Sequence, residues 1–308
     1  MSIITAKTLF HFTQKDALIN ILGTGFRPTY CTEFGLENME DALKEMMIPM
    51  VCFCDLPLSK LDKHINGYSW EYNGTTHQSK QYGSYGLGMS KEWGIRRRLN
   101  PVTYVNPGSF LLEFAGNSAN ELNRLYNEYE DRWEKDPTDE HIKNYYNYPL
   151  ARGISMGVPP MPHNYQTFFK LQVALLNSLA TLGYMKPYQN ATTGQVYYDE
   201  REWRVTVPHT RRYMGGVPSL VKMGDQFVPL IGHKEGKVYD IDEFKKNIAD
   251  YYMFEFNADD IKYIIVKDDS DIEDVIKRLH ELPNKYSSEA IHLLTTRILT
   301  CKQLREDF

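Results

Sequence analysis

Apolar and polar positions alternate in the second half of the stretch from Tyr197 to Val207. Aromatic and β-branched residues are frequent there, and a period of two predicts a strand with two unlike faces. Because an isolated carboxylate is costly to bury, we expect the charged face to be solvated, paired or part of a functional cleft. The apolar face consists of Trp203, Val205 and Val207, and the polar face consists of Glu200, Glu202, Arg204 and Thr206.

Shorter apolar runs and helical spacings complete the predicted secondary structure. Thr13, with Asp16 three residues later, and Ser90 are natural N-caps for the helices that follow them. Together the elements predict an α+β fold with a β core and flanking helices. The predicted strands cover residues 8–12, 49–55, 100–105, 226–231 and 261–266, and the predicted helices cover residues 14–22, 38–47, 91–99, 117–148, 164–182, 242–252, 271–282 and 288–304.

The length of 308 residues is enough for one large domain. The chain changes character at residue 117, where acidic residues begin to cluster on a helical pattern. We therefore interpret residues 1–308 as a single domain in which residues 109–185 form a mainly helical insertion. This insertion either completes the core or provides a surface for a substrate or a partner.

Composition and charge narrow the class of protein. The chain is 42% hydrophobic and 24% charged, which is typical of a soluble globular protein. The net charge of −5 argues against strong unspecific binding to nucleic acid or to anionic membranes, although it allows a local basic groove. We expect no membrane span, because no apolar run reaches roughly 18 residues, and no signal peptide at the start of the chain.

The four cysteines are too few for a disulfide framework in a chain of this size, so we expect a reduced, cytoplasmic protein. Cys52 and Cys54 lie two residues apart on a predicted strand. This spacing matches no closed zinc site, and we expect no metal.

Three further features are candidates for ligand binding. His11 ends the first predicted strand, next to a helix start whose N–H groups suit a polar or anionic ligand. Residues 60–81 are polar and aromatic, as in a lid or binding loop. Glycines are closely spaced between Tyr82 and Ser90, which lets a backbone pass close to a ligand, but the lysine of a P-loop is missing.

The order of these motifs resembles the ADP-ribosyltransferase superfamily. Its members carry a His-x-Thr motif on an early strand, an aromatic-Gly-x-Gly segment and a late Glu, often as Glu-x-Glu. The matching residues here are His11 to Thr13, Tyr85 to Gly88, and Glu200 with Glu202. The resemblance implies an ADP-ribosyltransferase-like fold, which is a split, mostly antiparallel β core with flanking helices and here a helical insertion. It also implies NAD as the substrate.

At closer range the chain is similar to the AbiGi family of bacterial abortive-infection proteins, which act in phage defence. The family has been described as the antitoxin-like member of its operon, paired with a nucleotidyltransferase. The similarity is carried by residues 9–13, 49–57, 82–88 and 202–204, which are spread over roughly the first two-thirds of the chain.

The transferase resemblance implies a role for each motif residue. Glu202 would hold the ribose hydroxyl and stabilise the oxocarbenium charge that develops when the nicotinamide–ribose bond breaks. Glu200 would orient or deprotonate the accepting group. His11 would donate to the adenine-side ribose, the backbone of Phe12 would pair with the nicotinamide amide, and Thr13 would fix the turn.

The stacking residue has two alternatives. Tyr85 would stack on the nicotinamide while Gly86 lets the backbone approach it. The superfamily pattern is normally aromatic where this chain has Ser90, so Tyr82 is the other candidate. Arg204, on the polar strand face, belongs to the same binding set.

A second alignment, to DNA-modifying relatives of the DarT type, makes residues 51–55 the equivalent strand. Asp55 then lines the site, and Tyr85 becomes peripheral. The assignment of Glu202 is the same in both alignments.

The leading hypothesis is a toxin-like, NAD-dependent ADP-ribosyltransferase of anti-phage defence that modifies nucleic acid (RNA or DNA) or protein. Such an enzyme needs restraint, so we expect a partner antitoxin or chaperone that docks on the acidic helical region or the last helix. One alternative is an NAD hydrolase, and another is a catalytically inactive, antitoxin-like protein that binds a partner. The presence of His11 with the Glu200 and Glu202 pair favours an enzyme, because a decayed site has no need for a costly carboxylate pair.

Overall fold

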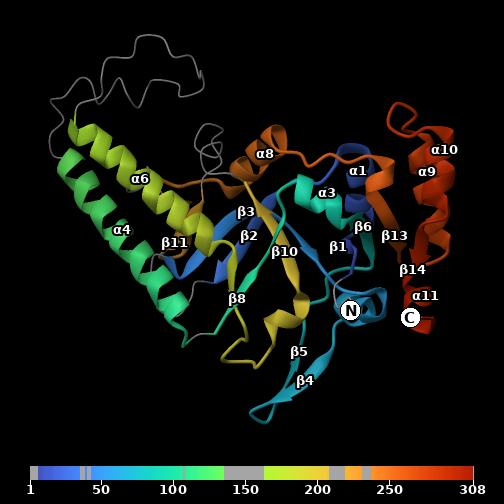
Figure 1. The fold of residues 1–308 in the computed structure, drawn as a ribbon, viewed down its shortest axis with the longest axis horizontal. Coiled ribbons are helices and arrows are strands. Elements are labelled where there is room, and N and C mark those ends of the chain that lie inside the picture. The colour runs from blue at the N-terminus through green and yellow to red at the C-terminus, as the bar shows by residue number, and fades with distance from the viewer. Residues whose placement is uncertain are drawn as a thin grey trace.

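The structure is a computed structural model that describes residues 6–34, 39, 43–106, 108–134, 163–207, 219–230 and 237–307. Within these ranges the chain forms an α+β fold around one large mixed sheet (Figure 1). The main strand order is β12-β11-β3-β1-β6-β13-β14; β10 and β2 also pair with β3, and β7 pairs with β10. The pairings within this sheet are antiparallel except for β13 with β14.

The strands of the large sheet are β1 (Thr8–Thr13), β2 (Thr29–Phe34), β3 (Glu45–Cys54), β6 (Tyr85–Ser90), β7 (Asn100–Pro101), β10 (Glu202–Thr206), β11 (Leu220–Met223), β12 (Gln226–Pro229), β13 (Ile261–Val266) and β14 (Ile298–Thr300). Two smaller sheets pair β4 (Ser69–Tyr72) with β5 (Thr75–Gln78), and β8 (Thr103–Val105) with β9 (Met185–Pro187).

The α-helices are α1 (Lys15–Thr24), α2 (Leu61–Asn66), α3 (Lys91–Arg96), α4 (Phe110–Glu134), α6 (His163–Leu182), α8 (Ile241–Tyr251), α9 (Ser270–His280), α10 (Ser288–Thr295) and α11 (Cys301–Glu306). The short 3₁₀ helices in the described part of the chain are η2 (Leu58–Lys60), η3 (Tyr197–Glu200) and η4 (Ala258–Asp260).

The long strand β3 organises the sheet, because it pairs with β1 and β2 as well as with β10 and β11. Cys54 at its end is the register partner of both Phe10 in β1 and Glu202 in β10. Directly opposed residues on neighbouring strands share a face of the sheet. Glu202 therefore lies on the face that carries Phe10, and the next residue of β1, His11, points to the other face.

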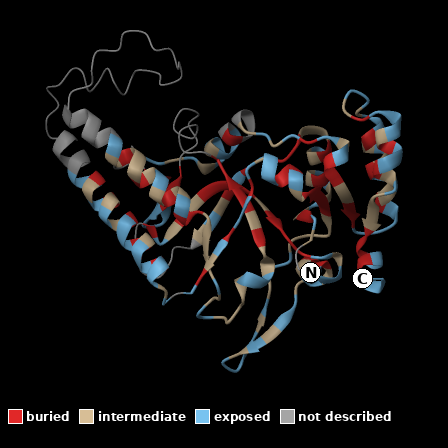
Figure 2. Cartoon of the chain, in the orientation of Figure 1, coloured by how far each residue is buried: buried red, intermediate tan, exposed pale blue. Residues whose placement is uncertain are grey.

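Helices cover both faces of the sheet. On the His11 face, side chains of α1, α3, α9 and α10 pack with strand residues such as Leu9, Phe53 and Leu87. On the Glu202 face, α4 and α6 pack against Ile48 and Met50 in the first part of β3. Near the end of β3 on the same face, α2 and α11 pack around Cys54. Figure 2 shows that the buried residues follow the sheet and the helix surfaces turned towards it.

Several predicted elements are confirmed. The strands at residues 8–12, 49–55 and 261–266 correspond to β1, the second half of β3 and β13. The amphipathic helices at 164–182, 242–252 and 271–282 correspond to α6, α8 and α9. Ser90 caps α3, since its hydroxyl accepts a hydrogen bond from the Trp93 N–H at 3.1 Å. Helices α4 and α6 lie in the predicted helical region 109–185, of which residues 135–162 are outside the described part.

Other expectations were wrong. The helix predicted at 38–47 conflicts with β3, which already begins at Glu45. The single helix predicted at 288–304 is divided into α10, β14 and α11, because Ile298 pairs with Ile264 of β13. Thr13 is not an N-cap; it remains in β1, and Gln14 caps α1 without a side-chain hydrogen bond.

Candidate functional site

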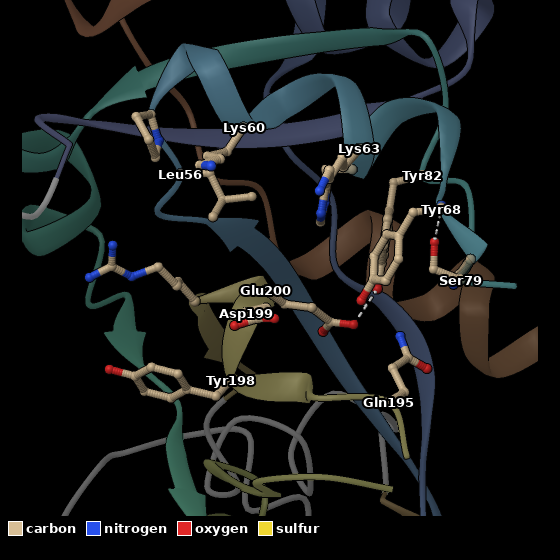
Figure 3. Close-up of a pocket in the computed structure, with 14 residues that line it drawn as sticks. Leu56, Lys60, Lys63, Tyr68, Ser79, Tyr82, Gln195, Tyr198, Asp199 and Glu200 are labelled. Carbon is tan, nitrogen blue, oxygen red and sulfur yellow. Dashed lines mark hydrogen bonds between the residues drawn. The ribbon is translucent and has the colours of Figure 1, made fainter. Parts of the chain in front are cut away.

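A pocket of about 570 Å³ lies beside the start of β10, which is within the usual size range of small-molecule sites. Figure 3 shows that Leu56, Lys60 and Lys63 stand along one wall. Residues 195–201 form the wall opposite, and Glu200 extends from it towards Tyr82. Residues of the region 60–81, the candidate lid or binding loop, are part of this lining.

Cationic side chains outnumber carboxylates around this pocket. Within the described part of the chain, Lys60 and Lys63 have no ion-pair partner, which leaves their charges available to a ligand. Phosphate groups are frequent partners of such exposed cations. The lining cations are Lys60, Lys63, Lys80 and Arg201, and the lining carboxylates are Asp199 and Glu200.

The pocket also has a flat aromatic surface. The rings of His64 and Tyr82 stack with centroids 4.1 Å apart and an interplanar angle of 2°. Burial, together with the positive charge of Lys186, lowers the pKa of His64 from 6.5 to about 4, so its ring is neutral near neutral pH. Tyr68 and Tyr198 line the same space. Surfaces of this kind suit a planar ligand group such as a nucleobase or nicotinamide.

The pocket carboxylate Glu200 comes from η3, just before the strand. One of its oxygens accepts a hydrogen bond from the Tyr82 hydroxyl at 3.0 Å, and the other contacts the Lys186 ammonium at 2.7 Å. The following residue, Arg201, has the left-handed backbone conformation (φ 44°, ψ 49°), which is uncommon outside glycine. The Asp55 N–H donates to the Arg201 carbonyl at 3.0 Å and holds this turn.

That turn places Glu200 before the strand, although its carboxylate and that of Glu202 both contact the Lys186 ammonium. Glu202 is 9% exposed and lies in a buried ionic cluster rather than in the pocket lining. Its two oxygens accept hydrogen bonds from Nε and Nη2 of Arg204, each at 2.8 Å. Lys186 adds a third contact at 3.2 Å. Arg204 is fully buried and also reaches Glu33 at 3.3 Å and the Gly183 carbonyl at 2.9 Å.

The electrostatics of the cluster keep Glu202 ionised. Burial by itself raises the pKa of this carboxyl, but the positive charges of Arg204 and Lys186 outweigh it and lower the pKa from 4.5 to about 2. Burial also raises the pKa of Glu33, only partly offset by Arg204. The charged strand face is therefore paired and buried, one of the environments that the sequence left open.

His11 is not brought together with Glu202. Its Nδ1 lies 2.8 Å from the Cys52 carbonyl oxygen, and its ring packs on Phe26 and Phe53 on the other face of the sheet. Burial lowers the pKa of His11. Phe12 points to the opposite face, where its ring contacts His64 of the pocket lining.

The predicted glycine segment forms strand β6 next to β1. The Tyr85 hydroxyl donates to Asp271 at 2.9 Å, and Tyr85 does not line the pocket, whereas Tyr82 does. A Cβ at Gly86 would lie 2.8 Å from the His11 carbonyl oxygen, and one at Gly88 would lie 2.7 Å from the Phe10 ring. Packing of β1 on β6 therefore accounts for these two glycines.

Asp55, the strand-end alternative, is also outside the pocket lining. One of its oxygens contacts the Lys91 ammonium at 2.7 Å, and that ammonium lies over the Trp203 ring at 5.1 Å. Trp203 directly follows Glu202 in β10, so its side chain projects from the opposite face of the sheet. The ion pair of Asp55 and Lys91 therefore lies on the His11 face.

Sequence reasoning missed several residues of the site. Lys60 and Lys63 fall in the region that the sequence marked as a binding loop, but nothing singled them out. His64 lies in the same region and was considered only as a zinc ligand with Cys52 and Cys54. Lys186 follows a long amphipathic helix as an isolated lysine and gave no signal at all. Among the described residues no cluster of His, Cys, Asp or Glu could hold a metal ion. No described helix is long and apolar enough to cross a membrane.

Comparisons with known proteins identify relatives of the chain. The family described as "Putative abortive phage resistance protein AbiGi, antitoxin" matches residues 24–267. The "Abortive phage resistance protein AbiGi" of Lactococcus lactis subsp. cremoris is 34% identical over 101 residues, which are 32% of this chain and 37% of that relative. The aligned part thus spans little more than a third of the relative. No solved structure matches the chain.

Proposed function

Because the chain belongs to the AbiGi family of abortive phage resistance proteins, we propose that it acts in anti-phage defence by binding NAD in the pocket beside Glu200 and transferring its ADP-ribose group. The position of Glu200 carries the proposal. It presents a carboxylate to a pocket that combines an aromatic stack with an excess of cationic side chains.

The lining suits the parts of a dinucleotide. Lys60 and Lys63 on one wall offer ammonium groups to a diphosphate. The stacked rings of His64 and Tyr82 offer a planar surface to a base or to nicotinamide. A carboxylate beside them accepts hydrogen bonds from ribose hydroxyls.

The chemistry needs a fixed negative charge near the ribose. As the bond between nicotinamide and C1′ breaks, nicotinamide leaves with the bonding electrons and C1′ gains oxocarbenium character, which a nearby carboxylate stabilises. The acceptor then forms a bond to C1′ and loses a proton, which Glu200 can accept. With water as the acceptor the product is free ADP-ribose. In this proposal Glu202 supports the pocket wall, because it lies outside the pocket lining and is paired with the buried Arg204.

The test compares wild type with Glu200→Gln after incubation with labelled NAD and cell extract. We expect the substitution to lower nicotinamide release by about 100-fold or more. Glu121→Gln is the control, because Glu121 is an exposed α4 residue that pairs with Arg124. Nuclease and protease treatment of the labelled products assigns the acceptor as nucleic acid or protein. Absence of release and of label transfer in wild type would refute the proposal.

A second candidate function is that of a catalytically inactive, antitoxin-like protein that binds a partner. The closed pairing of Glu202 and the separation of His11 from it favour this candidate, as does the description of the family. In this candidate the partner docks at the start of α4, where Phe110, Leu111 and Phe114 are 74%, 51% and 63% exposed. Tight co-purification with an operon neighbour, unchanged by Glu200→Gln, would support it.

A further inference from the structure

Lys186 occupies a central place in the ionic cluster although it lies outside both the pocket lining and the core of the large sheet. It belongs to β9, where it pairs with Tyr104 of β8. Its side chain is only 17% exposed. The ammonium lies 2.7 Å from Glu200, 3.2 Å from Glu202 and 4.9 Å from the centre of the Tyr197 ring.

The two carboxylates depend on Lys186 to different degrees. Glu202 already has a two-pronged pairing with the guanidinium of Arg204. Among the described residues Glu200 has no such second cation, since the partner of its other oxygen there is the neutral Tyr82 hydroxyl. Two carboxylates this close repel each other unless a positive charge lies between them. Loss of Lys186 therefore affects Glu200 more than Glu202.

The backbone around Lys186 is held in place by the same cluster. The Gly183 carbonyl accepts a hydrogen bond from Arg204 at 2.9 Å, and the Tyr184 hydroxyl accepts one from the Thr206 N–H at 3.1 Å. Both residues lie between α6 and β9. These contacts fix the segment that carries Lys186, so its ammonium is held in place beside the carboxylates.

We propose that Lys186 is a positioning residue that bridges Glu200 and Glu202 and thereby holds the Glu200 carboxylate at the pocket wall against Tyr82. The inference rests on the proposed function only for its catalytic consequence. Without the ammonium, the repulsion between the carboxylates is relieved either by rotation of Glu200 away from Tyr82 or by retention of a proton on the pair. Either response removes the charge that the pocket presents.

The experiment compares Lys186→Met and Lys186→Arg with wild type. Lys222→Met serves as a control, because it removes an ion pair, to Glu45, on the surface. The first measurement does not depend on enzymatic activity. Crystal structures show the Glu200–Tyr82 contact, and ¹³C NMR of the glutamate carboxyls gives their pKa values. In Lys186→Met we expect the contact between Glu200 and Tyr82 to be lost and the pKa of Glu202 to rise above about 2. In Lys186→Arg we expect the Glu200–Tyr82 contact and the lowered pKa of Glu202 to be kept. Lys222→Met should change neither the contact nor this pKa.

The second measurement is the pH profile of nicotinamide release. We expect Lys186→Met to lower kcat about tenfold with little change in KM, and the acid limb of the profile to move to higher pH, with recovery in Lys186→Arg. An unchanged Glu200–Tyr82 contact and an unchanged Glu202 titration in Lys186→Met would overturn the inference. If wild type releases no nicotinamide, the proposed function fails, and the structures and carboxyl titrations still decide the role of Lys186.

Discussion

Glu202 and His11 lie in neighbouring parts of one sheet but project from its opposite faces. Glu202 and Phe10 share Cys54 as register partner, and His11 follows Phe10 directly. His11 packs on Phe53 in the core, and Glu202 pairs with Arg204 on the other side. Neither side chain lines the pocket. The carboxylates that line the pocket are those of Asp199 and Glu200. The proposed chemistry is assigned to Glu200, because its side chain extends towards Tyr82 beside the aromatic stack.

Arg204→Met is expected to destabilise the fold by about 3–5 kcal/mol, because it leaves the buried Glu202 and the half-buried Glu33 without their shared cation. Urea unfolding followed by circular dichroism measures the change. Lys222→Met, which breaks an exposed pair, should stay within about 1 kcal/mol of wild type. A loss of less than 1 kcal/mol in Arg204→Met would show that the cluster contributes little to the fold.

Acid should weaken the fold through Glu202. Its pKa is lowered from 4.5 to about 2 in the folded chain, so its contribution is complete above about pH 4.5 and is lost as the pH falls towards 2. This pKa shift corresponds to a contribution of about 3 kcal/mol to the free energy of unfolding. Urea unfolding between about pH 6 and pH 2 should show a steeper decline in wild type than in Glu202→Gln. Parallel curves for the two proteins would contradict this account.

Gly88→Ala tests the structural reason for the glycines of β6. A Cβ at this position would lie 2.7 Å from the Phe10 ring and 2.9 Å from the Thr8 methyl group, so we expect a loss of about 1–3 kcal/mol in unfolding free energy. Gly108→Ala is the control, because a Cβ there meets nothing within 4 Å. Lost nucleotide binding in Gly88→Ala with unchanged stability would instead indicate a ligand-contacting role.

The start of α4 is the expected docking surface if the chain binds a protein partner. The rings of Phe110 and Phe114 stack at 6.0 Å while both remain mostly exposed. The double change Phe110→Ser and Phe114→Ser should weaken co-purification of the operon partner at least tenfold, since exposed aromatic anchors carry much of an interface's affinity. Ile95→Ser, at a separate exposed position on α3, should have no effect. Equal co-purification of the partner with wild type, the double variant and Ile95→Ser would exclude the start of α4 as the docking surface.

The alternation of residues 202–206 predicted both faces of β10, because a strand's period is local and independent of its neighbours. The position of Glu200 outside the strand, in the pocket lining, was not predictable in the same way. It depends on the left-handed turn at Arg201, a residue type with no preference for that conformation. The pairing of Glu202 could be predicted only in part from the sequence. Arg204 lies two residues away, but Lys186 and Glu33 join the ionic cluster through tertiary contacts.

Residues 288–304 also show that tertiary contacts can override a local sequence pattern. Residues 288–304 carry apolar positions at helical spacing, yet Ile298 and Leu299 pair with β13 as strand β14. An exposed strand edge in the folded protein decided that conformation over local preference. The single helix predicted there could not take account of an edge formed by residues more than thirty positions earlier.

The most direct test of the central claim is a quantitative measurement of nicotinamide released from NAD by wild type, Glu200→Gln and Glu202→Gln, each verified as folded by circular dichroism. The account predicts release by wild type, a loss of about 100-fold or more in Glu200→Gln, and a smaller loss in Glu202→Gln, whose carboxylate does not line the pocket. Equal release by wild type and Glu200→Gln, or none by wild type in the presence of cell extract, would contradict it.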